Sequence, residues 1–189
     1  MLRSTLALLG LALSASASAY DFDYTYLDLG YGQIEFDDVD IDGDGFGIGG
    51  SFAISPDFHL FAGYNAADLD FDVDATTLSA GIGWHRGLSD VVDFVATLSY
   101  EYVELDASGF GSADDNGLGL GAGLRFAATE QLEINGGITY VDLSDSGDET
   151  SIGIGGLYKF TDMFALGLGG SWGDDTSSYT LTGRFYFGK

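Results

Sequence analysis

The sequence predicts an all-β fold, a transmembrane antiparallel up-and-down β-barrel of ten strands, with eight strands as the alternative count. Three observations predict it. Apolar and polar residues alternate with period two over most of the chain, the apolar faces repeat at one fixed length, and the connections alternate between short turns and longer acidic stretches. No segment after Ala19 shows a sustained helical period.

The N-terminus has the pattern of a secretory signal peptide. Arg3 is followed by an apolar run from Leu6 to Leu13 and by a small-residue stretch that ends at Ala19. The apolar run is too short for a membrane-spanning helix, which needs about 20 residues. We therefore expect export with cleavage after residue 19, and one barrel domain over residues 20–189.

Composition excludes several classes of protein. The segment 1–19 removes only Arg3, so five Lys and Arg face 30 Asp and Glu in the mature chain, a formal charge of −25. Phosphate contacts need a basic surface, so nucleic acid is not an expected partner. A content of 14% aromatic residues argues against disorder. The chain has no cysteine, which excludes a disulfide scaffold and a thiolate metal site.

Seven segments each place five residues on one apolar face over nine positions, and two shorter segments repeat the pattern. Eight intervals at about 3.4 Å give roughly 27 Å along a strand. Tilted by about 40°, such a strand spans roughly 21 Å of height, close to the apolar band of outer-membrane barrels. Strands of soluble proteins are typically about five or six residues long. The faces begin and end at Phe46–Ile54, Phe94–Tyr102, Leu118–Phe126, Leu132–Tyr140, Ile152–Phe160, Phe164–Trp172 and Tyr179–Phe187, with shorter versions at Phe58–Tyr64 and Leu78–Trp84.

The connections indicate the strand count and the orientation. Outer-membrane barrels have short periplasmic turns and longer outer loops. Four short turns and five longer acidic segments give ten strands with both termini in the periplasm. The expected turns are residues 55–57, 86–90, 127–130 and 161–162, and the expected outer loops are 37–45, 66–75, 106–116, 142–149 and 173–178.

Aromatic residues on the apolar face gather at both ends of the predicted strands. Two aromatic girdles mark the two membrane interfaces in barrels of this kind. One girdle lies beside the short turns: Phe58, Trp84, Phe94, Phe126, Phe160, Phe164 and Phe187. The other lies beside the acidic segments: Phe46, Tyr64, Tyr100, Tyr102, Tyr140, Trp172 and Tyr179.

Two stretches carry a family resemblance. The last predicted strand ends in Phe185-Tyr186-Phe187 and resembles the terminal strand that the bacterial barrel-assembly machinery recognises. The stretch Gly49–Tyr64, GGSFAISPDFHLFAGY, resembles the small xanthomonad-type barrels. The chain as a whole is similar to the small outer-membrane β-barrel proteins of Gram-negative bacteria, the OmpX-like and opacity-type barrels. The resemblance implies a monomeric integral membrane protein with no settled molecular activity.

The first acidic segment contains part of a calcium-loop spacing. Asp38, Asp40, Asp42 and Gly43 fit the opening D-x-D-x-D-G, but the twelfth position is Gly49 where the closing Glu is needed. A solvated acidic surface that shares divalent cations with lipopolysaccharide phosphates is the better interpretation, and we assign no metal ligand. The same interpretation applies to Asp68, Asp70, Asp72 and Asp74.

Both histidines adjoin short turns. His59 and His85 therefore map to the periplasmic end and face inward, away from the lipopolysaccharide side where some outer-membrane enzymes act. We expect ordinary hydrogen-bonded histidines and no enzyme. We assign no catalytic or cofactor-binding residue and expect no cofactor.

The inward face carries charges among glycines and small polar residues. Buried charges need partners, so we expect an Arg/Lys–carboxylate network that fills the lumen. The expected function is a structural or surface-interaction barrel of the cell outer membrane, and the alternative is a porin-like narrow pore for water, small cations or a small solute. Expected partners are outer-membrane lipid, lipopolysaccharide and the assembly machinery, and we expect a monomer. The inward charges are Asp93, Glu101, Arg125, Glu133, Lys159 and Arg184.

Overall fold

The computed structural model describes residues 20–36, 41–109, 111–174 and 176–187. The expected signal peptide, Asp38 and Asp40 lie outside these ranges. Among the described residues, no helix is long and apolar enough to cross a membrane. The strands are β1 Tyr26–Phe36, β2 Ile41–Ala53, β3 Phe58–Leu69, β4 Val73–Ser89, β5 Val92–Ala107, β6 Gly111–Ala127, β7 Leu132–Leu143, β8 Gly147–Thr161, β9 Phe164–Trp172 and β10 Thr176–Tyr186.

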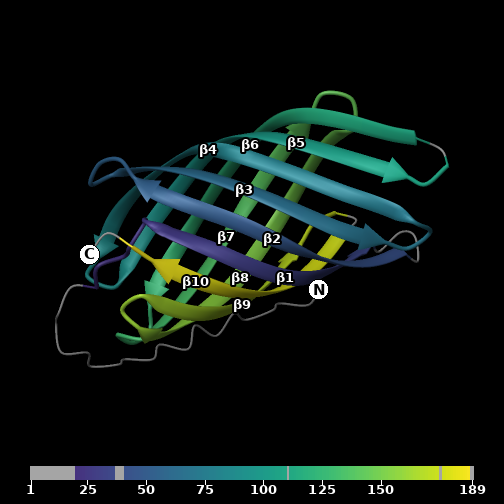
Figure 1. The fold of residues 1–189 in the computed structure, drawn as a ribbon. Coiled ribbons are helices and arrows are strands. Elements are labelled where there is room, and N and C mark those ends of the chain that lie inside the picture. The colour runs from purple at the N-terminus through teal and green to yellow at the C-terminus, as the bar shows by residue number, and fades with distance from the viewer. Residues whose placement is uncertain (1–19, 37–40, 110, 175, 188–189) are drawn as a thin grey trace, which may run out of the picture.

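The ten strands form one closed barrel in which each strand pairs antiparallel with its sequence neighbours and β1 pairs with β10 (Figure 1). The expected count of ten is confirmed. A path that starts at Asp28 on β1 moves from each residue to its ladder partner on the next strand. In one direction around the barrel this path reaches β8 at Gly147, and in the other direction it reaches β8 at Lys159. The two positions are twelve apart, and for ten strands this stagger corresponds to a tilt of about 40°.

The apolar faces predicted from the sequence point outward. Phe52 is 63% exposed and Leu168 is 69% exposed, whereas inward neighbours such as Ser51 are buried. Aromatic contacts gather at the two edges of this apolar band, for example Trp84 with Phe94 at one edge and Trp172 with Tyr179 at the other. An outward apolar band with an aromatic girdle at each edge is the surface that a bilayer requires.

The connections differ from the expectation at both ends. Most described residues of the five acidic segments expected as long loops are paired strand, and the described residues left between these strands are 70–72, 108–109, 144–146 and 173–174. The expected turn 86–90 is also mostly strand, because β4 continues to Ser89 across a register shift. Backbone pairing needs no apolar outward face, so the ladder continues beyond the membrane band. The end that carries the turns at residues 54–57, 90–91, 128–131 and 162–163 is here called the periplasmic end, and the opposite end the outer end.

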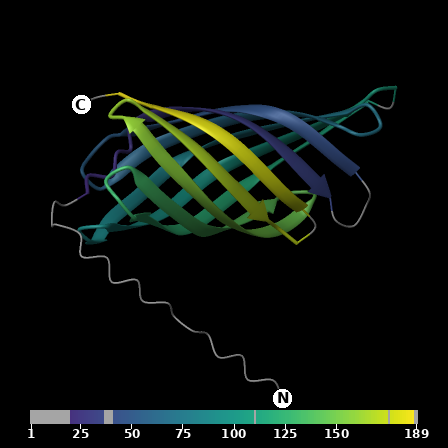
Figure 2. The ribbon, with the colours of Figure 1, turned by 90° about the horizontal axis from the view of Figure 1, so that it is seen from below.

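At the outer end the two faces of the wall exchange their polarity, with acids on the outside and apolar residues on the inside. We call the strand segments that show this exchange the outer extension. They are residues 33–36, 41–44, 66–69, 73–76, 103–107, 111–116, 141–143 and 147–150. Tyr31 on the outer face donates a hydrogen bond to Asp44 at 2.8 Å, which places that acid outside. Several hairpins project beyond the rest of the wall (Figure 2). Acids line the outside: Glu35, Asp42, Asp44, Asp68, Asp74, Glu104, Asp106, Asp114, Asp142 and Asp148. Apolar residues line the inside: Ile34, Phe36, Ile41, Leu69, Val73, Val103, Leu105, Val141 and Leu143.

Candidate functional site: the lumen and its periplasmic floor

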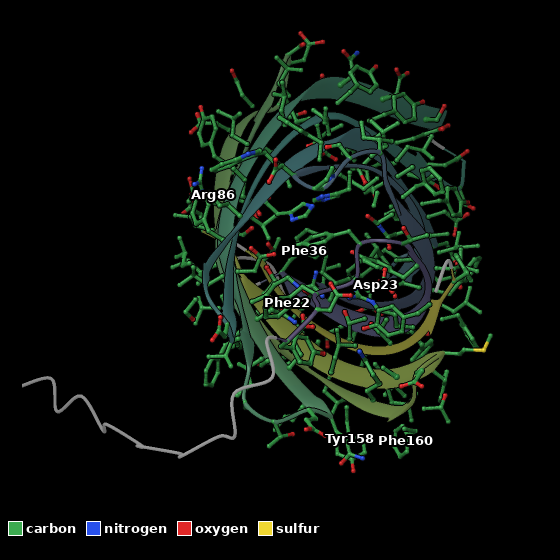
Figure 3. The ribbon with its side chains drawn as sticks, turned by 90° about the vertical axis from the view of Figure 1, so that its left-hand side faces the viewer. Phe22, Asp23, Phe36, Arg86, Tyr158 and Phe160 are labelled. Carbon is green, nitrogen blue, oxygen red and sulfur yellow. The ribbon has the colours of Figure 1, made fainter. Side chains whose placement is uncertain are left out.

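Residues 20–25, which precede β1, enter the barrel at the periplasmic end. Viewed along the barrel from that end, the segment that carries Phe22 and Asp23 lies inside the ring of strands, whereas Tyr158 and Phe160 lie outside it (Figure 3). The backbone amide of Tyr20 donates to the carbonyl of Asp90 at 2.8 Å. Asp23 accepts from the amide of Thr25 at 2.8 Å, a local turn that leads into β1.

Tyr24 anchors this segment in the lumen. It is 5% exposed, and its ring stacks on His85 at 3.7 Å and on His59 at 4.6 Å between ring centroids. Its hydroxyl donates to Asp93 Oδ2 at 2.7 Å. Ser51 Oγ donates to the Tyr24 carbonyl at 2.7 Å. Residues from β2, β3, β4 and β5 therefore contact the ring, the hydroxyl and the backbone carbonyl of Tyr24.

A buried ion pair lies beside Tyr24. Arg125 on β6 and Glu133 on β7 form a bidentate pair with distances of 2.7 and 2.9 Å. The guanidinium also lies 4.5 Å from the Tyr24 ring centroid and 5.0 Å from that of Phe22. Its Nη1 donates to the Asp23 carbonyl at 3.3 Å. A single arginine thus joins the barrel wall to three residues of the inserted segment.

A second ion pair and a lysine complete the layer. Arg184 on β10 and Asp28 on β1 pair in bidentate geometry at 2.8 and 2.7 Å, and the guanidinium stands 3.6 Å from the Tyr26 ring centroid. The Lys159 ammonium lies 5.2 Å from the ring of Tyr20 and 5.0 Å from that of Tyr186. We call residues 20–25 together with these two ion pairs the periplasmic floor.

Glycine allows large side chains to fill this layer. A Cβ at Gly83 on β4 would overlap the ring of His59, which lies across that position from β3. At Gly123 a Cβ would stand 2.9 Å from the carbonyl oxygen of Gly136 on the neighbouring strand. Glycine is needed at both positions because of close approach.

Above the floor the lumen is open. A cavity of about 730 Å³ extends from Tyr24, Tyr26 and Arg184 up the barrel interior. Its wall combines many glycines with hydroxyl side chains, the amide of Asn135 and apolar side chains such as Phe61, Val95 and Leu157. The hydroxyl residues include Ser79, Thr97, Ser99, Thr139 and Thr180. The lumen is therefore filled at the periplasmic end and hollow in its middle part, because the lining of the cavity includes no residue of the outer extension.

The structure brings together some of the charges predicted to form a network. Arg125 and Glu133 pair as expected, and Arg184 pairs with Asp28, a residue the sequence interpretation did not include. Lys159 contacts aromatic rings, and Glu101 accepts a hydrogen bond from Ser99 Oγ at 2.5 Å. Both Asp93 and His85 contact Tyr24, with 3.6 Å between Asp93 Oδ2 and His85 Nδ1.

The inserted segment was missed by sequence reasoning. The signal available was the six-residue stretch between the expected cleavage site and the first strand, YDFDYT, in which aromatic residues alternate with acids. The two histidines are placed as expected, inward and at the periplasmic end, with His59 5% exposed. The expectation that both are ordinary hydrogen-bonded histidines is wrong, because among the described residues His59 Nδ1 and His85 Nε2 are buried without a hydrogen-bond partner and both rings are instead stacked on Tyr24.

The acidic segments give no compact metal geometry in the part of the chain that is described. No group of three or more His, Asp and Glu side chains there is arranged to hold an ion. The backbone amide of Asp42 donates a hydrogen bond to the side-chain Oδ2 of Asp70 at 3.2 Å.

A closed barrel with an outward apolar band and a polar interior defines an integral membrane β-barrel. Residues 4–169 match the family model described as outer membrane protein beta-barrel domain, and the chain belongs to that family. Membership places the protein in the outer membrane.

Several solved outer-membrane barrels are similar in structure. The KdgM porin has a TM-score of 0.49 and 12% identity, with 85% of this chain and 99% of that chain covered. The N-terminal barrel of Pseudomonas aeruginosa OprF has a TM-score of 0.47 and 12% identity, with coverage of 86% and 98%. Ail of Yersinia pestis has a TM-score of 0.41 and 17% identity, with coverage of 87% and 99%. No curated protein sequence matches the chain.

Proposed function

We propose that the protein is a closed, non-conducting outer-membrane barrel with a structural or surface-interaction role. The observation that carries the proposal is the periplasmic floor. Tyr24 is 5% exposed and Arg125 is 8% exposed inside what would otherwise be an open tube. In a barrel of this size, side chains are sufficient to fill the interior.

The outer extension supports a role at the surface. Its outward acids form a collar above the membrane band, and the mature chain carries a net charge of −25. Such a collar attracts divalent cations, which can be shared with lipopolysaccharide phosphates, and it repels anionic solutes. We propose a monomer surrounded by outer-membrane lipid and lipopolysaccharide, inserted by the barrel-assembly machinery through β10.

A narrow pore is the second candidate function. It is favoured by the cavity of about 730 Å³, because only the floor separates this volume from the periplasm. Residues 20–25 are held by side-chain contacts and single backbone bonds and have no ladder partner. A barrel whose segment left the lumen would have a wider path.

An enzymatic role is not proposed. His59 and His85 are both stacked on Tyr24 of the floor, away from the outer end. We accordingly assign no catalytic residue.

Planar-bilayer conductance tests the proposal. The full mature chain is compared with a chain that starts at Thr25, and a Gln33→Ala variant on the outer face of β1 serves as the control. We expect no unitary steps from the full chain or the control, and steps from the shortened chain. Stable unitary steps from the full chain would contradict the proposal and support the narrow pore. The difference in gel mobility between boiled and unboiled samples verifies that each barrel is folded.

A further inference from the structure

The charges in the lumen are separated along its height. The three basic side chains that face inward in the described parts of the chain, Arg125, Lys159 and Arg184, all lie in the layer of the periplasmic floor. Each is engaged there by a carboxylate or by aromatic rings. The hollow part of the lumen above them has no inward base within the described ranges.

Glu101 stands in that hollow part. It projects inward from β5 between Tyr100 and Tyr102, and it belongs to the wall of the cavity. Its Oε1 accepts a hydrogen bond from Ser99 Oγ at 2.5 Å. No ion pair to Glu101 is present among the residues that the structure describes.

The surroundings of Glu101 leave space beside its carboxylate. Its ladder partners are Ser79 on one side and Gly117 on the other. A Cβ at Gly119 would lie 2.9 Å from Glu101 Oε1, so the carboxylate leans over a position that has no side chain. Small residues with hydroxyls or no side chain thus adjoin the Glu101 carboxylate along the ladder.

The cavity has the size of a small-molecule site. Ligand pockets are typically about 300–1,000 Å³, and this one is about 730 Å³. Such a volume exceeds what one desolvated inorganic ion fills by more than an order of magnitude, since a water molecule takes about 30 Å³. The wall hydroxyls and the amide of Asn135 suit a ligand with several hydrogen-bonding groups, and the apolar side chains of Phe61, Val95 and Leu157 suit its carbon skeleton.

We propose that the lumen above the floor binds a small organic cation, an amine or a guanidinium, with Glu101 as its counter-ion. The carboxylate pairs with the charged head, and Ser79 and the other wall hydroxyls bind the remaining polar groups. The acidic collar at the mouth raises the local concentration of cations and repels anions. The proposal rests on the proposed function, because the periplasmic floor closes one end of the lumen and leaves a cavity that opens only toward the outer end.

Isothermal titration of the folded full mature chain in detergent tests the assignment. Agmatine, which carries both an amine and a guanidinium, is the probe, and 0.15 M NaCl screens the collar. We expect one site per chain in the wild type and at least tenfold weaker binding in Glu101→Gln. The control is Glu104→Gln on the same strand, whose carboxylate is on the outer face and accepts from Tyr102 at 3.3 Å.

Retained binding in Glu104→Gln together with loss in Glu101→Gln is the expected result. Equal loss of binding in both variants would show general attraction to the acidic collar. Equal affinity of Glu101→Gln and wild type would show that Glu101 is not part of the site. Either result overturns the assignment, and so does absence of binding to the wild type. If Glu101→Gln fails to fold, Ser99→Ala is measured instead and should weaken binding several-fold. Conductance reports on the floor and titration reports on Glu101, so the two proposals fail separately.

Discussion

The Tyr24 ring is stacked on the His85 imidazole, with 3.7 Å between their centroids, and this contact joins the N-terminal segment to the wall of the barrel. Tyr24 lies in the segment before β1, and His85 lies near the end of β4. The contact belongs to the layer of the periplasmic floor, and the first four predictions below concern that layer.

Removal of the Tyr24 side chain should release the N-terminal segment. Tyr24→Ala loses both stacks and the hydrogen bond to Asp93, so we expect conductance steps and rapid cleavage of residues 20–25 by protease added at the periplasmic face. Tyr24→Phe keeps the stacks and loses one hydrogen bond, a cost of about 1 kcal/mol. It should stay closed. A silent, protease-resistant Tyr24→Ala barrel would show that the floor does not depend on this anchor.

The Arg125–Glu133 pair should show strong coupling. Loss of one partner leaves a buried charge without compensation, which costs about 3–5 kcal/mol, so Arg125→Leu and Glu133→Leu should each lower the unfolding midpoint in urea. The double variant should be less destabilised than the sum of the two, because no unpaired charge remains. Additive effects in this double-mutant cycle would contradict the pairing.

The binding of residues 20–25 inside the lumen should weaken at alkaline pH. Burial raises the pKa of the Tyr24 phenol above its ordinary value near 10, with the hydrogen bond to Asp93 acting in the same direction against the Arg125 charge. The seated state therefore favours the protonated phenol, and its stability is fully present below about pH 10 and is lost as the pH rises. Protease sensitivity of residues 20–25 should increase above about pH 10 in the wild type and stay flat in Tyr24→Phe.

Close packing of glycine against His59 gives a further test. Gly83→Ala would place a methyl group in the space of the imidazole, so we expect destabilisation of about 1–3 kcal/mol. Gly153→Ala is the control, because its nearest neighbour is a carbonyl oxygen at 3.7 Å. Thermal unfolding followed by gel mobility compares the two. Equal midpoints would mean that the wall adjusts without cost.

The boundary between the membrane band and the outer extension can be located on one strand. Leu98 and Asp106 both face outward on β5, at the centre of the band and beyond it. Leu98→Arg should destabilise the barrel by about 2–4 kcal/mol in lipid vesicles. Asp106→Arg should change the unfolding free energy little, since that position is in water. A large penalty at residue 106 would place it within the bilayer.

The repeated nine-residue apolar faces were enough to predict the membrane barrel and the outward direction of residues such as Phe52 and Leu168, and the alternation of short turns with acidic segments predicted ten strands. Period two fixes the face on which each side chain lies, and a bilayer requires a face of one particular length, so both properties are local. The inward direction of His59, Arg125 and Glu133 followed from the same alternation.

The outer extension was not predicted, because its strands can be recognised only from the register of their pairing. Segments such as residues 66–75 keep period two, but with acids outward and apolar residues inward, so their acidity predicted loops. Ala67, Leu69, Val73 and Ala75 pair directly across β3 and β4. Sequence position alone does not show that these two short stretches face each other.

The periplasmic floor and the cavity above it were decided by the tertiary structure alone. Tyr24, His59, His85 and Asp93 converge because closure of the barrel brings β1, β3, β4 and β5 around one interior, at separations of up to 69 residues. Within the described ranges, Glu101 is separated from the inward bases Arg125, Lys159 and Arg184 by the height at which β5 presents it. Alternation determines whether a side chain faces lipid or lumen, but the stagger of the closed ladder determines at which depth it lies and which partner it meets.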